Sequence, residues 1–148
     1  MAGMSVTPWW LMGAAILFAL VFVNALLGAG DGAIGGVGLV IQLLELGAAV
    51  GIPLLAAHED GTVWAGARTG AVMTVIAAAV VLVWGATGLP PFPAIDLSPI
   101  LGLSIGELVA IIVALAVIGL VGLVMGTIGG VIGRWLFRRA RQESLERL

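Results

Sequence analysis

Cysteine and lysine are absent from this 148-residue chain, and only 9% of its residues are charged. Without cysteine, disulfides, thiol catalysis and cysteine-ligated metal centres are excluded. A soluble domain carries about 25% charged residues, so this chain has too few charges to cover a surface that faces water. Its net charge of -2 and its six arginines, which form no broad basic face, predict that nucleic acid is not a partner.

Apolar residues and glycine are abundant instead. Hydrophobic residues make up 61% of the chain, the mean hydropathy is +1.24, and there are 23 glycines. A membrane-spanning helix needs about 20 predominantly apolar residues. We therefore predict an all-α integral membrane protein, a single domain folded as a four-helix transmembrane bundle. The expected spans are residues 8–27, 33–57, 62–86 and 105–133.

The segments between and after the spans predict the orientation. Residues 88–103 contain four prolines, which exclude a regular helix, and we expect this apolar segment in the membrane interface. Residues 134–148 form a tail with five of the six arginines. Residues 28–32 and 88–103, on the opposite side, contain no lysine or arginine, so the positive-inside rule places both termini in the cytoplasm.

The basic tail is where we expect contact with lipid headgroups. Basic residues beside a membrane attract anionic lipid, and the residues concerned are Arg134, Arg138, Arg139 and Arg141. The simplest interpretation is that they anchor the topology of the chain. Specific binding of a lipid or of a partner is the alternative.

Glycines recur at intervals of four residues in three of the expected spans. The sets are Gly47 with Gly51, Gly66 with Gly70, and Gly122 with Gly126 and Gly130. This spacing places small residues on one helix face, where a neighbouring backbone can approach closely. We expect helix packing through these glycine faces, and a homo-oligomer or a larger membrane complex. The sequence leaves open whether the last set meets another span or a second copy.

One acid, Glu45, lies near the middle of the second span. A carboxylate at membrane depth is costly, so it marks a candidate functional site. Gln42 lies three residues earlier on the same helix face, and Arg68 is the only basic residue within a span. Three interpretations stay open: hydrogen bonds of Glu45 to Gln42 or to the backbone, a buried ion pair with Arg68, and a path for protons or cations.

The other polar residues form no catalytic pattern. His58, Glu59 and Asp60 are adjacent in an expected turn, and three consecutive residues rarely converge on one metal ion, so we expect no metal site. The four serines have no nearby histidine or paired acid that would activate a nucleophile. We expect a protein that is not an enzyme and needs no cofactor.

Three patches carry a resemblance to a known family: VNALLGA (residues 23–29), GTVWAGARTGAVMTVIAA (residues 61–78) and GTIGGVIGR (residues 126–134). They resemble small glycine-rich multi-span membrane proteins of haloarchaea, a domain family of unknown function. The resemblance implies a multi-span membrane fold and no activity. In size and number of spans the chain is also similar to small membrane proteins of archaeal enveloped viruses, which makes a viral membrane the alternative to a cell membrane.

Two functions follow from these observations as expectations. The first is a non-enzymatic structural or accessory membrane protein, whose glycine faces pack it into an oligomer or a larger complex. The second is a proton- or ion-conducting bundle that uses the carboxyl group of Glu45.

Overall fold

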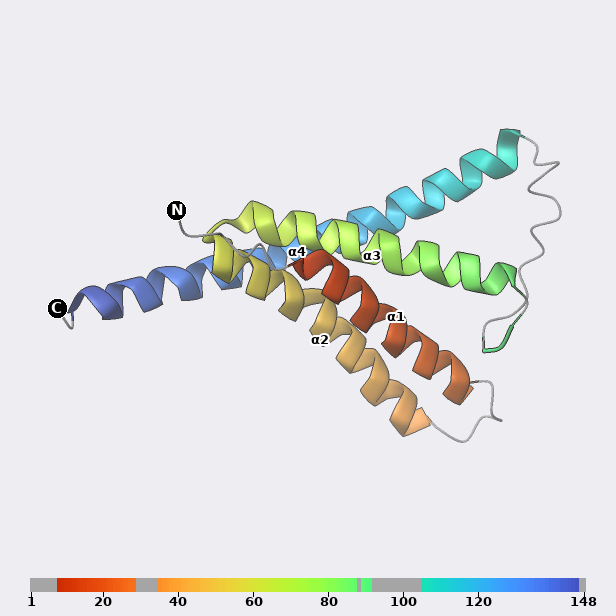
Figure 1. Ribbon diagram of the computed structural model, residues 1–148, viewed down its shortest axis with the longest axis horizontal. Helices are drawn as coiled ribbons and strands as arrows, with labels where there is room; N and C mark the ends of the chain where they lie inside the picture. The colour runs from red at the N-terminus through yellow and green to blue at the C-terminus, as the bar shows by residue number, and fades with distance from the viewer. Residues whose placement is uncertain (1–7, 29–34, 88, 92–104, 147–148) are drawn as a thin grey trace.

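The computed structural model of the chain describes residues 8–28, 35–87, 89–91 and 105–146. These residues form four helices and no strand. The helices are α1 (Trp9–Gly28), α2 (Gly35–Asp60), α3 (Val63–Ala86) and α4 (Ile105–Glu146) (Figure 1). All four are long and apolar enough to cross a membrane. The prediction of an all-α, multi-pass membrane protein with four helical spans is confirmed.

The connection between α2 and α3 follows local signals in the sequence. α2 continues to Asp60, three residues beyond the expected end of the second span, and includes the residues expected in a turn. It stops before Gly61, whose φ of +69° is a backbone conformation that favours glycine. The hydroxyl of Thr62 then caps α3, because it accepts a hydrogen bond from the backbone N–H of Ala65 at 3.3 Å.

α4 is much longer than the other helices. It has 42 residues and continues without a break from the fourth expected span into the basic tail, as far as Glu146. At 1.5 Å per residue such a helix is about 63 Å long, twice the roughly 30 Å of a bilayer core. Its last part therefore projects beyond the bundle (Figure 1). Most of the proline-rich segment expected at 88–103 lies outside the described residues.

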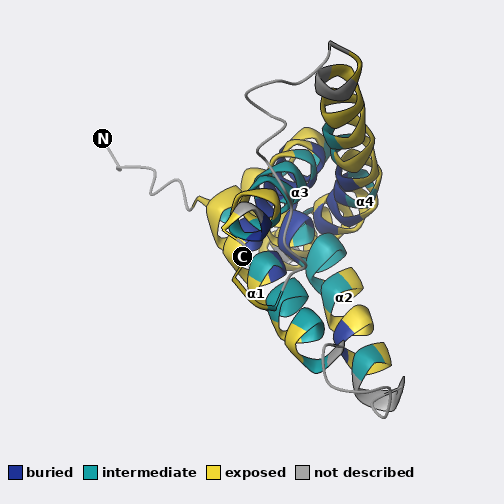
Figure 2. Ribbon diagram, turned by 90° about the vertical axis from the view of Figure 1, so that its right-hand side faces the viewer, coloured by how far each residue is buried: buried dark blue, intermediate teal, exposed yellow. Residues whose placement is uncertain are grey.

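α2 and α3 are the central helices. Each contacts all three other helices, whereas the described parts of α1 and α4 are not in contact with each other. We call the end of the bundle where α2 meets α3 the tail end, and the end where α3 stops and α4 begins the loop end. α3 and α4 cross near the tail end and diverge toward the loop end (Figures 1 and 2).

The crossing of α3 and α4 occurs where glycine faces glycine. A Cβ atom added to Gly66 would lie 2.6 Å from the Cα of Gly130, and one added to Gly70 would lie 2.6 Å from the Cα of Gly126. A Cβ on Gly122 would lie 2.5 Å from the backbone oxygen of Gly70. Side chains never approach backbone atoms this closely, so the two helices reach this separation only because these positions have no side chain.

Two further glycines bring α4 against α2. A Cβ on Gly129 would lie 3.0 Å from the backbone nitrogen of Leu54, and one on Gly133 would lie 3.1 Å from the Cβ of Ala57. Ala57 and Pro53 are fully buried at this contact. α4 therefore rests on both α2 and α3 at the tail end through positions without side chains.

The apolar core lies between α1, α2 and α3. Its largest fully buried side chain is Met73 of α3, which packs with Leu17, Ile52 and Ala77. A Cβ on Gly13 of α1 would lie 3.2 Å from a methyl group of Ile52, so α1 also comes close to the core at a glycine. Most large apolar side chains are instead exposed, as expected for helices that lie in lipid. Exposed residues occur along the helices in Figure 2.

Candidate functional site

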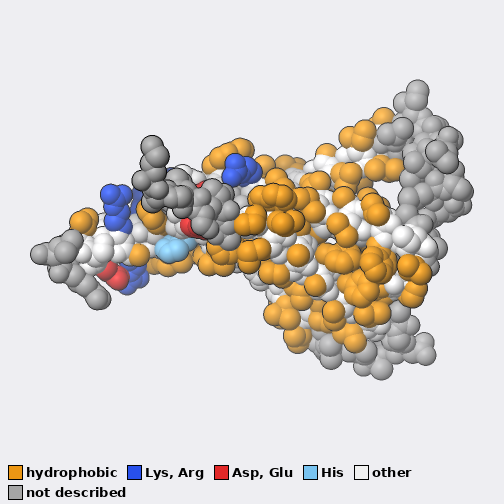
Figure 3. Space-filling model, in the orientation of Figure 1, with side chains coloured by type: hydrophobic (Ala, Val, Ile, Leu, Met, Phe, Trp, Pro, Cys, Tyr) orange, Lys and Arg blue, Asp and Glu red, His pale blue; other side chains and the backbone are white. Residues whose placement is uncertain are grey.

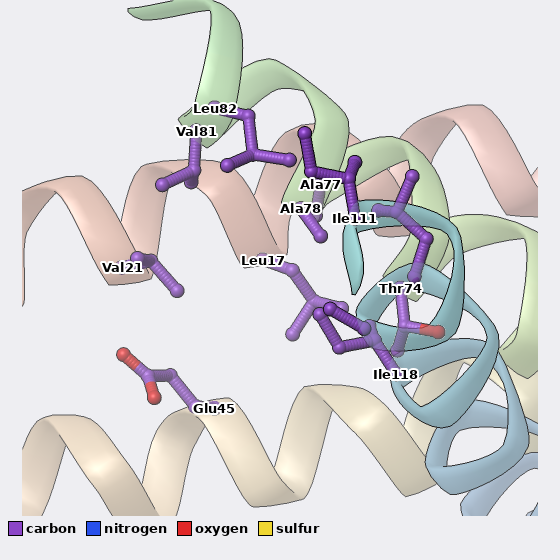
Figure 4. A pocket seen from close by; sticks show the side chains of 12 residues that line it. Leu17, Val21, Glu45, Thr74, Ala77, Ala78, Val81, Leu82, Ile111 and Ile118 are labelled. Atoms are coloured by element: carbon purple, nitrogen blue, oxygen red, sulfur yellow. The ribbon is translucent and has the colours of Figure 1, made fainter. Parts of the chain in front are cut away.

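An apolar cleft lies between the middle of the bundle and its loop end, where α3 and α4 diverge. Its volume is about 450 Å³, and it opens to the surface. All four helices line it (Figure 4). The lining residues are Leu17 and Val21 of α1, Glu45 of α2, Thr74, Ala77, Ala78, Val81 and Leu82 of α3, and Ile111, Ala114, Leu115 and Ile118 of α4.

Helical periodicity explains how these residues come to share one space. The α4 residues that line the cleft are spaced i, i+3, i+4 and i+7, which places them on one face of the helix. The α3 residues follow the same spacing and add one more at i+8. The glycine crossing near the tail end then holds these two faces at an angle, so they separate toward the loop end instead of packing against each other.

Glu45 reaches the cleft because it occupies a core-facing position of α2. Ile41 and Ile52, four residues before it and seven residues after it, lie on the same helix face and are only 6% and 8% exposed. Burial of these two apolar side chains orients that face of α2 toward α1 and α3. Glu45 must then point inward as well, and it is half-buried.

The carboxyl group of Glu45 has no partner within the described part of the chain. Its Oε1 atom is buried and makes no hydrogen bond. In Figure 4 the carboxyl group points away from α2 into the open space below Val21 and Leu17. A buried polar atom without a hydrogen bond costs about 1–3 kcal/mol, so this position is a local exception to an otherwise apolar wall.

The structure does not bring Gln42 or Arg68 to Glu45. Gln42 is exposed, and neither residue forms a hydrogen bond or an ion pair with Glu45. Arg68 is exposed, and it lines a separate pocket with Trp10, Thr69 and Val72. It lies five residues into α3, about 8 Å from the tail end, whereas Glu45 lies fifteen residues before the end of α2, about 22 Å from it. The interpretations that pair Glu45 with Gln42 or Arg68 are wrong for this structure.

Among the described lining residues, Thr74 is the only other one with a polar side chain. Its hydroxyl group lies 2.9 Å from the backbone oxygen of Gly70 and 3.0 Å from that of Ala71, so its proton is used within α3. The remaining lining residues are apolar. The cleft therefore suits an apolar molecule and offers it one carboxyl group, but it provides no row of polar groups along which an ion or a proton would move.

The other polar residues considered from the sequence lie at the tail end. The side chains of His58, Glu59 and Asp60 are exposed at the end of α2. The indole N–H of Trp9 donates a hydrogen bond to Glu59, and the ring of His58 stands edge-on to Phe137 at 6.2 Å. Within the described ranges, no three histidine or acidic side chains are placed to hold a metal ion.

The arginines expected at lipid headgroups surround the protruding part of α4. Arg134, Arg138 and Arg141 line a shallow pocket there with Phe137. Arg139 forms an ion pair with Glu143 at 3.3 Å and lies over the ring of Trp135, 5.6 Å from its centroid. Charged side chains gather here, while apolar side chains cover the body of the bundle (Figure 3).

The predicted glycine positions separate into two groups. Gly66, Gly70, Gly122, Gly126 and Gly130 all lie at the α3–α4 crossing within the chain. Gly47 and Gly51 of α2 do not: a Cβ at either would meet nothing within 4 Å. These two positions lie on an outward face of α2, with exposed Leu44 and Leu55 on the same side.

The cleft itself was not foreseen from the sequence. Its apolar lining residues look like any other apolar residues of a membrane span, and they come from three helices without a common motif. The i, i+3, i+4, i+7 spacing on α3 and α4 is present in the sequence, but it also fits a face packed against another helix. Only the angle between α3 and α4 distinguishes a cleft from a packed interface.

Comparison of the chain with protein-family models, curated proteins and solved structures finds no match. The resemblance to small glycine-rich membrane proteins of haloarchaea stays a prediction, based on the three patches that carry it.

Proposed function

We propose that this protein is a non-enzymatic, structural or accessory membrane protein that assembles into a homo-oligomer, alone or within a larger membrane complex. The observation that carries the proposal is the outward position of Gly47 and Gly51. The other glycine sets face helices of the same chain, whereas no described residue lies within 4 Å of a Cβ atom placed on either glycine of this pair.

Glycine is a costly residue in the middle of a helix that nothing approaches. It is about 1 kcal/mol less favourable than alanine in a helix interior in water. In a bilayer, small residues four positions apart allow a second helix to approach closely, and packing then stabilises the pair. The exposed leucines on the same face would flank such a partner. These features support α2 as the helix through which copies associate.

The proposed orientation places both termini and the tail end in the cytoplasm. Its support is the concentration of five of the six arginines in residues 134–148, together with the positive-inside rule. Arg134, Arg138 and Arg141 share one pocket on the protruding part of α4, where contact with anionic headgroups would add to the anchoring.

Ion conduction through Glu45 is the less favoured function. The unpaired carboxyl group supports it, but the apolar lining of the cleft argues against a continuous polar path within one chain. An oligomer would need to supply the missing polar groups.

The oligomer is tested by replacing Gly51 with leucine and counting subunits in lipid vesicles by single-molecule photobleaching. We expect Gly51→Leu to raise the dissociation constant about tenfold, the factor that 1.4 kcal/mol of lost packing gives. Gly38→Leu is the matched control, because Gly38 also has open space around it but lies on the opposite face of α2. Unchanged association of Gly51→Leu, with a folded protein, would overturn the proposal.

A further inference from the structure

The cleft has the properties of a binding site for a small apolar molecule. Its volume of about 450 Å³ lies within the range of about 300–1,000 Å³ that is usual for ligand pockets. Such pockets are mostly apolar and contain a few polar groups that orient the ligand. Here the polar group is the carboxyl of Glu45, which lies at the edge of the cleft below Val21 (Figure 4) and has one buried oxygen without a hydrogen bond.

Hydrogen bonding defines what the ligand must provide. The one polar neighbour in the lining, Thr74, already donates its proton to carbonyl groups of α3 and does not satisfy Glu45. A lipid acyl chain could fill the cleft, but it would leave the carboxyl group of Glu45 without a hydrogen bond. A ligand that carries a hydrogen-bond donor beside its apolar body would fill the cleft and also satisfy a carboxyl oxygen.

Membrane depth determines the charge of that donor. Glu45 lies ten residues after the start of α2, about 15 Å from the loop end, which is half the thickness of a bilayer core of about 30 Å. An ammonium group is costly to bring to this depth. A neutral hydroxyl group costs far less, and the hydrogen bond to Glu45 offsets that cost.

We propose that the cleft binds a neutral lipophilic alcohol whose apolar body lies between α1, α3 and α4 and whose hydroxyl group donates a hydrogen bond to Glu45. The alcohol enters from the bilayer, in which it is soluble. This site is independent of the proposed oligomer, because Gly47 and Gly51 lie on a different face of α2 from Glu45.

The test uses a long-chain alcohol that carries a photoreactive diazirine on its alkyl chain, with its methyl ether as the analogue without a donor. The purified full-length protein, in phosphatidylcholine nanodiscs, is irradiated with each probe, and the labelled residues are identified by mass spectrometry. We expect the alcohol to label cleft residues such as Val21, Val81 and Ile111 about fivefold more than the ether does. This is the factor that one net hydrogen bond of about 1 kcal/mol gives.

Variants assign that preference to Glu45. Glu45→Leu should abolish the difference between alcohol and ether, and Glu45→Gln, which keeps an acceptor, should retain part of it. Gln42→Leu is the matched control, since Gln42 is exposed one turn away and should leave the preference unchanged. If Glu45→Leu does not fold, Ala114→Phe serves instead: it places a large side chain in the cleft and should abolish labelling of Val21.

Three results would overturn the proposal. One is equal labelling of the cleft by alcohol and ether in the unmodified protein. Another is stronger labelling by the corresponding long-chain amine, which would show a cationic ligand. The third is labelling of the cleft no greater than that of the exposed residue Leu120 of α4, including the case in which a second copy of the chain occupies the cleft.

Discussion

At the scale of single residues, Glu45 differs from the buried residues on its helix face. Ile41 and Ile52 of that face are buried apolar residues, and a leucine at position 45 would fit the wall of the cleft. The unpaired Oε1 atom instead leaves a polar group where the fold needs none. A residue that the fold does not need at that position is better explained by binding than by stability.

Replacing this residue should therefore not weaken the fold. We expect Glu45→Leu to raise the free energy of unfolding by about 1–3 kcal/mol, because it removes a buried polar atom without a partner. Reversible unfolding in mixed micelles, followed by circular dichroism, measures the change. Gln42→Leu makes the same kind of substitution at an exposed position and should change the value little. A clear loss of stability in Glu45→Leu would mean that the carboxyl group has a structural partner.

At the scale of the helices, the positions without side chains determine where α4 lies. Gly126 of α4 meets Gly66, Ala67 and Gly70 of α3, all through backbone atoms that cannot move aside as a side chain can. The contact fixes both the separation and the crossing point of α3 and α4. Through this crossing the same glycines hold the cleft open farther along the two helices.

Replacing glycine with alanine should change the melting temperature differently at the α3–α4 crossing and at a position with open space. We expect Gly126→Ala to lower the melting temperature, because its Cβ would lie 2.5 Å from the backbone oxygen of Gly66. Gly38→Ala should leave it unchanged or raise it, since nothing lies within 4 Å and alanine is the better helix former by about 1 kcal/mol in water. Thermal unfolding in detergent compares the two variants. A melting temperature of Gly126→Ala equal to that of the unmodified protein would contradict the close crossing.

Hydropathy and spacing predicted the elements of this fold but not their pairing. The energy of placing a span in a bilayer is nearly a sum over its residues, so four apolar runs predict four helices. The partner of a glycine face depends on contacts between distant segments, and the sequence could not distinguish α3 from a second copy as the partner of Gly126. Likewise, the order of the spans places Arg68 on the helix that follows the helix of Glu45. In the structure, however, Arg68 lies on a different face of the bundle, in a pocket with Trp10.

The ends of α2 and α4 follow from the local sequence. Gly61, with its positive φ, ends the long α2 and was recognisable as a turn residue. α4 continues to Glu146 because no proline or glycine follows Gly133 to stop it, and its last turns are strengthened by the Arg139–Glu143 pair. The expected boundary at residue 133 marked a change from apolar to charged sequence, not the end of the helix.

At the scale of the whole molecule, the bundle is closed at the tail end, and α3 and α4 diverge toward the loop end. The glycine crossing closes one end, the cleft occupies the widening space beyond it, and the outward face of α2 remains for assembly. The most direct test is a comparison of two distances between α3 and α4. The absence of cysteine makes this simple, because each introduced cysteine can be spin-labelled without background.

The measurement is double electron–electron resonance on two double-cysteine variants in lipid nanodiscs. One pair replaces Trp64 and Ile132 near the tail end, and the other replaces Val83 and Ile112 near the loop end. All four positions are exposed, and each pair lies at a matched level on the two helices. We predict a clearly shorter distance for the tail-end pair than for the loop-end pair. Equal distances, or a shorter distance at the loop end, would mean that α3 and α4 pack along their whole length and that the cleft does not exist.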